Sequence, residues 1–66
     1  MYKITKVFSQ DPARHTKEIE ILCTNVSDLP SLEEIDKKGI EAGSTAYVSK
    51  TKQGFILNTE KEWDAL

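Results

Sequence analysis

The strongest indication of the fold lies in residues 43–63, which read GSTAYVSKTKQGFILNTEKEW. Residues 44–49 alternate between small or apolar and polar side chains, which is typical of a strand with one buried face. A second apolar run, residues 55–57, follows a polar loop that ends in Gly54. Because glycine suits the left-handed position in loops of three to five residues, the segment predicts a β-hairpin.

The residues after this hairpin predict a turn and a return to the sheet. The side chain of Asn58 can hydrogen-bond the backbone of residues 59–62, which favours a turn there. Trp63 and Leu66 are then expected to fold back on the sheet. Core packing is expected for Trp63, Phe55 and Phe8, because so small a domain has few other large side chains to bury.

The N-terminal third predicts a second hairpin. Residues 2–8 and 16–24 both alternate, and Asp11-Pro12 between them favours a turn. The short connection implies antiparallel neighbours. One face of the first strand carries Tyr2, Ile4 and Phe8, and one face of the second strand carries Ile19, Ile21 and Cys23.

A short helix is predicted between the two hairpins, over residues 32–38. Ser31 and Glu34 have capping-box spacing, in which each side chain bonds the other residue's backbone N–H. Gly39 suits the left-handed C′ position, and Ile40 would then meet Ile35. The predicted fold class is therefore α+β: a small antiparallel sheet of four to five strands, arranged as hairpin, short helix, hairpin.

Length and composition limit the function. The chain of 66 residues is expected to form a single domain, residues 1–66, with a marginal core that self-association would supplement. Its apolar runs are far shorter than a membrane span, so no membrane partner is expected. Nine basic and eleven acidic side chains form no basic patch, so no nucleic acid is expected. The N-terminus lacks the pattern of a secretory signal, which predicts a cytoplasmic protein.

No catalytic, cofactor or metal site is predicted. Cys23 lies on an apolar strand face, where a thiol is inert. His15 lies in a charged loop, and a single cysteine and a single histidine do not make a structural zinc site. The carboxylates of residues 33–36 are explained by helix capping and the helix dipole. Gly43-Ser44-Thr45 lacks the lysine and the helix of a phosphate-binding loop.

Two aromatic residues are the candidate binding residues. Tyr47 lies on the strand face opposite Ala46 and Val48, so its ring is the best candidate for contact with a partner. Trp63 is the second candidate, with a core position as its other interpretation.

The C-terminal segment resembles a family of small, mostly uncharacterised proteins of phages and prophages of Gram-positive bacteria, in which a segment of the form GSTAxxxxTGxxYxLNxxxxW closes the chain. The resemblance covers residues 43–63, about a third of the chain. It departs from the family at the turn, where two extra residues separate Thr51 from Gly54. It implies a virion-associated or prophage-encoded accessory protein and supplies no catalytic residues. The matching positions are Gly43, Ser44, Ala46, Val48, Phe55, Leu57, Asn58 and Trp63.

Three functions follow as hypotheses. The first is a non-enzymatic phage-type assembly or accessory protein, located in the host cytoplasm or on the virion. It would contact itself or a larger virion protein through a strand edge or a sheet face. The second is a regulatory protein that binds a basic partner through Glu18, Glu20 and the helix carboxylates. The third is carbohydrate contact, which requires Tyr47 and Trp63 on one exposed face.

Overall fold

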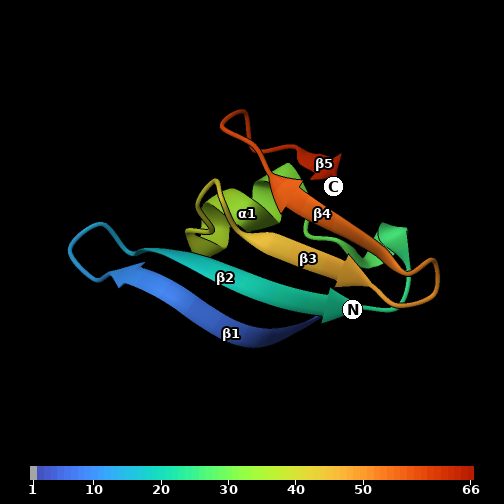
Figure 1. Cartoon of the computed structure of the whole chain (residues 1–66). Coiled ribbons are helices and arrows are strands. Elements are labelled where there is room, and N and C mark those ends of the chain that lie inside the picture. The colour runs from blue at the N-terminus through green and yellow to red at the C-terminus, as the bar shows by residue number, and fades with distance from the viewer. Residues whose placement is uncertain (1) are drawn as a thin grey trace.

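The computed structural model describes residues 2–66 as one five-stranded sheet with an α-helix against one face (Figure 1). The strands follow one another across the sheet in chain order. With one α-helix and one 3₁₀ turn the fold is mostly β, which is broadly compatible with the predicted α+β class. Among the described residues, no helix is long and apolar enough to cross a membrane. The elements are β1 (Tyr2–Asp11), β2 (Thr16–Cys23), η1 (Val26–Asp28), α1 (Leu32–Lys38), β3 (Thr45–Val48), β4 (Gln53–Leu57) and β5 (Trp63–Ala65).

The sheet is mixed, so the prediction of an antiparallel sheet is wrong. β2 and β3 pair in parallel, while β1–β2, β3–β4 and β4–β5 pair antiparallel. The reason is the length of the connection. Residues 24–44 include η1 and α1 and carry the chain back to the end of the sheet from which β2 started, which a parallel neighbour requires.

The helix begins and ends where its capping residues predict. The Ser31 hydroxyl accepts the Glu34 N–H (3.3 Å), and Gly39 closes the helix with a φ of 69°. Ile40 N–H donates to the Ile35 carbonyl (3.0 Å), and both side chains are buried. The predicted return bond from the Glu34 side chain is replaced by contacts with Tyr2 and Lys38. Only half of the capping box forms, because this carboxylate ties α1 to β1 instead.

The core lies between α1 and one face of the sheet. Its strand residues are the inward positions of β2, β3 and β4, and α1 with its C-terminal loop supplies the opposing isoleucines. Cys23 is buried as predicted. The buried apolar residues are Ile19, Ile21, Cys23, Ile35, Ile40, Ala46, Val48 and Leu57.

Two irregularities in β1 change which of its side chains face the core. The register with β2 shifts between Ile4 and Lys6 and again between Val7 and Ser9. Each shift places two β1 residues opposite one β2 residue and so resets the alternation. The expected core position of Phe8 is therefore wrong: its side chain is 46% exposed, and Val7, which pairs with the buried Ile19, is itself 48% exposed.

The connection between β3 and β4 also differs from its prediction. The left-handed residue of this loop is Lys52, with a φ of 55°, and not Gly54. Gly54 lies inside β4, opposite Tyr47. A Cβ at Gly54 would lie 3.1 Å from Leu66 Cδ1, so glycine here makes room for that side chain.

Candidate contact surface

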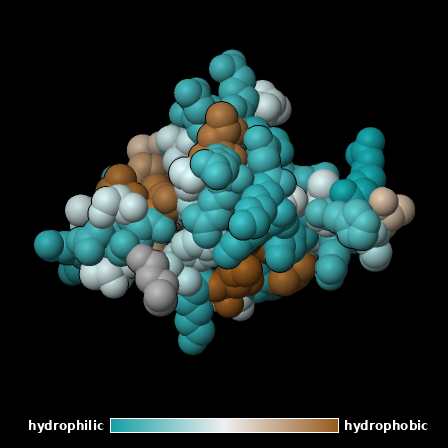
Figure 2. All heavy atoms as spheres, turned by 180° about the vertical axis from the view of Figure 1, so that it is seen from behind, coloured by the Kyte–Doolittle hydropathy of each residue, from teal (hydrophilic) through white to brown (hydrophobic). Residues whose placement is uncertain are grey.

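The two faces of the sheet differ in what covers them. Figure 2 looks at the side that carries α1, where the centre of the surface is hydrophilic and hydrophobic side chains lie around it, above, below and on the left. In the part of the chain that the structure describes, no helix packs on the other side, which we call the open face. Large side chains of this face therefore stay in solvent, where they are available to a partner.

Tyr47 lies at the middle of the open face. It belongs to β3, the third of the five strands, and pairs with Leu22 of β2 and Gly54 of β4. Its two neighbours along β3, Ala46 and Val48, are buried on the helix side, so the alternation directs the tyrosine away from the core. Tyr47 is 44% exposed and Leu22 is 40% exposed.

Leu66 extends this surface across the fourth strand. Its backbone N–H donates to the Gly54 carbonyl (2.9 Å), and its side chain lies over the space where Gly54 lacks a Cβ. Since Gly54 stands opposite Tyr47, Leu66 shares the open face with that tyrosine. Leu22, Tyr47 and Leu66 thus form a line across three strands, which we call the apolar row.

A second line of open-face residues runs beside the apolar row. The pairing register aligns one residue from each strand in the order Lys6, Glu20, Thr45, Ile56 and Asp64. Charge changes sign across it, with an ammonium on β1 at one edge and a carboxylate on β5 at the other. Neither Lys6 nor Asp64 forms an ion pair with the described residues 2–66.

The charged side chains of this second line have neutral contacts within the chain. Lys6 Nζ lies 5.2 Å from the centre of the Phe8 ring, and Asp64 accepts a hydrogen bond from Asn58 Nδ2 (2.9 Å). Glu20 Oε1 accepts a hydrogen bond from the Thr5 hydroxyl (3.0 Å). These contacts leave the charges of the two edge residues uncompensated.

Trp63 lies on the opposite side of the sheet from Tyr47. It pairs with the buried Leu57, packs against the core and donates its indole N–H to the Pro30 carbonyl (3.1 Å). This is the core interpretation of Trp63, in which the ring joins β5 to the loop before α1. The two candidate binding residues therefore do not form one surface, and the single exposed face that carbohydrate contact requires does not form from them.

The residues that carry the phage-like resemblance act mainly in the fold. Ser44 is fully buried; its hydroxyl donates to the Glu41 carbonyl (2.7 Å) and accepts the Ile19 N–H (3.1 Å). It thereby connects β2 to the residue just before β3. Gly43 has a φ of 97°, and a Cβ there would lie 3.0 Å from Glu18 Oε1.

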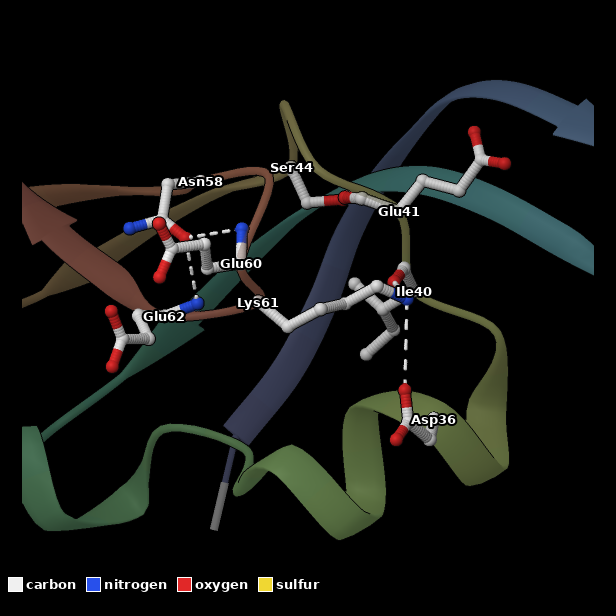
Figure 3. Close-up of polar contacts among 8 residues, drawn as sticks. All are labelled: Asp36, Ile40, Glu41, Ser44, Asn58, Glu60, Lys61 and Glu62. Atoms are coloured by element: carbon white, nitrogen blue, oxygen red, sulfur yellow. Dashed lines mark hydrogen bonds and ion pairs between the residues drawn. The ribbon is translucent and has the colours of Figure 1, made fainter.

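Asn58 organises the turn before β5, as predicted. Its Oδ1 accepts the backbone N–H groups of Glu60 (2.9 Å) and Glu62 (3.0 Å), as Figure 3 shows. Lys61 in the same turn reaches across to the C-terminal end of α1, where its Nζ lies 3.5 Å from the Ile40 carbonyl and 3.6 Å from Asp36 Oδ1. The turn is therefore fixed to the helix.

A polar cluster joins the start of β1 to α1. The Tyr2 hydroxyl donates to Glu34 Oε2 (2.8 Å) and accepts from Lys38 Nζ (2.9 Å). Burial raises the pKa of Tyr2, and its hydroxyl lowers the pKa of Glu34 and raises that of Lys38. An open cleft of about 740 Å³ lies beside the cluster, lined also by Ile4 and Leu29. The polar groups of the cluster already bond one another, so the role of the cluster is to hold β1 against α1.

Cys23 and His15 are the residues considered above for nucleophilic and metal chemistry. Burial raises the pKa of the Cys23 thiol, which donates to the Asn25 carbonyl (3.4 Å). His15 is exposed in the β1–β2 turn. No group of three or more potential metal ligands occurs in this range.

Comparison of the chain with protein-family models, with curated proteins and with solved structures finds no match.

The sequence identified Tyr47, at the centre of the candidate contact surface, as an exposed residue, but not Leu22 and Leu66 on either side of it. Tyr47 lies on the open face, as its alternation with Ala46 and Val48 predicts. Leu22 follows Glu18 and Glu20 in the same alternation phase, and this pattern could have identified it. Leu66 could not be found locally, because its place depends on the missing side chain of Gly54.

Proposed function

We propose that the protein is a non-enzymatic interaction module of phage type, which contacts protein partners through the open face of its sheet. The observation that carries the proposal is the apolar row, in which Leu22, Tyr47 and Leu66 stay exposed side by side on an uncovered sheet. A contiguous exposed apolar surface on a small domain is typical of a protein interaction site. The resemblance over residues 43–63 supports an accessory or assembly role in the host cell or on the virion.

The open face suits this role better than the long outer edge of β1. The edge carries two register shifts and the side chains of Lys3 and Lys6. Bulges and lysines are the features by which natural edge strands avoid pairing with other chains. Strand addition at β1 is therefore disfavoured, even though Ile4 and Val7 are exposed there.

The distribution of acidic residues does not favour the regulatory alternative. Glu20 lies on the open face beside Thr45, while Glu33 and Asp36 belong to α1 on the other side of the sheet. These carboxylates therefore form no continuous acidic surface for a basic partner.

The test compares what the chain binds with and without the apolar row. The tagged chain and its Tyr47→Asp variant are expressed in a Gram-positive bacterium in which a resident prophage is induced, and bound proteins are identified by mass spectrometry. Lys37→Glu, on the helix side, is the matched control. We expect phage structural proteins with the wild type and the control but not with Tyr47→Asp. Recovery of the same proteins by all three would contradict the proposal.

A further inference from the structure

We propose that the open face binds the open face of a second copy of the chain, with a two-fold axis running along β3. This inference rests on the proposed function and specifies its partner. Closed dimers use one self-complementary patch on both subunits. The geometry of the five strands determines which residues would meet across such an axis.

The apolar row is symmetric about Tyr47 in the way that this axis requires. β3 is the middle strand, with Leu22 on one side of Tyr47 and Leu66, over Gly54, on the other. Rotation about β3 places β2 of one copy over β4 of the other and keeps each residue at its level along the strands. Tyr47 would then face Tyr47 of the second copy, and each Leu22 would meet a Leu66. The six side chains of the two apolar rows are apolar or aromatic, as in the centre of protein interfaces, and Lys3 of β1 lies beside each Leu22 at the end of the row.

The charges at the edges favour the same arrangement. The rotation places β1 of one copy over β5 of the other, so Lys6 faces Asp64 at both ends of the contact. Each group lacks an ion-pair partner among residues 2–66 of its own chain. A two-fold axis perpendicular to the strands would instead stack β1 on β1 and β5 on β5, so Lys6 and Asp64 would not meet. Charge complementarity therefore selects the axis parallel to β3.

The size of the surface predicts a weak dimer. Five strands about 4.8 Å apart form a face about 24 Å wide, and β3 contributes only four residues to its height. Such a face falls below the roughly 800 Å² per partner of a standard stable interface. A dissociation constant above about 1 µM is expected, because even interfaces of standard size range from µM to pM.

The experiment is sedimentation equilibrium of the purified chain over concentrations that span this dissociation constant. The wild type is expected to show a monomer–dimer equilibrium, and Tyr47→Asp is expected to weaken it more than about thirtyfold, because the residue occurs twice at the axis. Lys37→Glu serves as the control for a change of charge outside the contact. Far-ultraviolet circular dichroism verifies that each variant is folded.

Charge exchange then tests the axis itself. Lys6→Glu and Asp64→Lys are each expected to weaken their own dimers about tenfold, because each creates two like-charge contacts. An equimolar mixture of the two variants should associate as well as the wild type, since both edge contacts regain opposite charges. A mixture of Lys6→Glu with wild type should associate with a strength between those of its two parents, since one of its two edge contacts keeps opposite charges and the other carries like charges.

Two results would overturn the inference: a wild type that stays monomeric over the whole range, or a charge-exchange mixture no stronger than the single variants. If the wild type is monomeric but its binding of phage structural proteins still depends on Tyr47, the dimer is refuted and the proposed function stands. A wild type that neither dimerises nor binds phage structural proteins through Tyr47 refutes the proposed function as well.

Discussion

Replacement of Ser44 by alanine should destabilise the fold by about 2 kcal/mol, and the structure gives the reason. The serine hydroxyl is the acceptor for the Ile19 N–H, and its own proton goes to the Glu41 carbonyl. That carbonyl keeps a partner in the variant, because it also accepts the Ser44 backbone N–H (3.2 Å). Only the buried Ile19 N–H loses its partner, and one buried unsatisfied donor costs about 1–3 kcal/mol.

The effect is large for a chain of this size. At about 0.05–0.15 kcal/mol per residue, a 66-residue domain has only about 3–10 kcal/mol of stability in total. Urea denaturation, followed by Trp63 fluorescence and by circular dichroism, measures the difference, and the melting temperature should fall by roughly 8–16 °C. Ser49→Ala, at an exposed position just beyond β3, is the matched control and should stay within about 0.5 kcal/mol of wild type. A Ser44→Ala variant as stable as Ser49→Ala would refute the structural role of the serine.

Three further results are expected from the described contacts. Gly39→Ala should cost more than about 2 kcal/mol in the same urea assay, because the position has a φ of 69° and the added Cβ would collide with the His15 carbonyl; a cost below about 1 kcal/mol would contradict this. The lowered pKa of Glu34 adds stability that is present above the ordinary carboxyl pKa of 4.5 and is lost as pH falls through the folded value. The free energy of unfolding of Glu34→Gln should therefore fall less steeply with decreasing pH than that of the wild type. An unchanged pH dependence below pH 4.5 would count against the Tyr2 contact. The Cys23 thiol should react with a thiol reagent at least about tenfold faster in denaturant than in the native chain, and equal rates would show that it is not buried.

Features determined by local chemistry could be predicted from the sequence. The helix bounds follow from the Ser31 hydroxyl at one end and the left-handed Gly39 at the other, and both act within one turn of the chain. Tyr47 was identified because alternation along β3 is regular. The turn at Asn58 was predicted because its side chain bonds only the residues just after it.

Features that depend on distant pairing could not be predicted. The register shifts that expose Phe8 arise between β1 and β2, and no residue type in β1 marks them. The parallel pairing of β2 with β3 depends on where residues 24–44 return the chain. Gly54 suggested a turn, yet its role is to accommodate Leu66, which lies twelve residues further along the chain. The apolar row could therefore be seen only once the sheet was assembled.

The most direct test of the open face as the contact surface is nuclear magnetic resonance of the wild-type chain at increasing concentration. The amide signals of Leu22, Tyr47 and Gly54 should shift together along one binding curve, because the apolar row forms the contact. The signals of Lys37 on α1 should stay in place and serve as the internal reference. Shifts confined to α1 or to the outer edge of β1, with Tyr47 unchanged, would contradict the account.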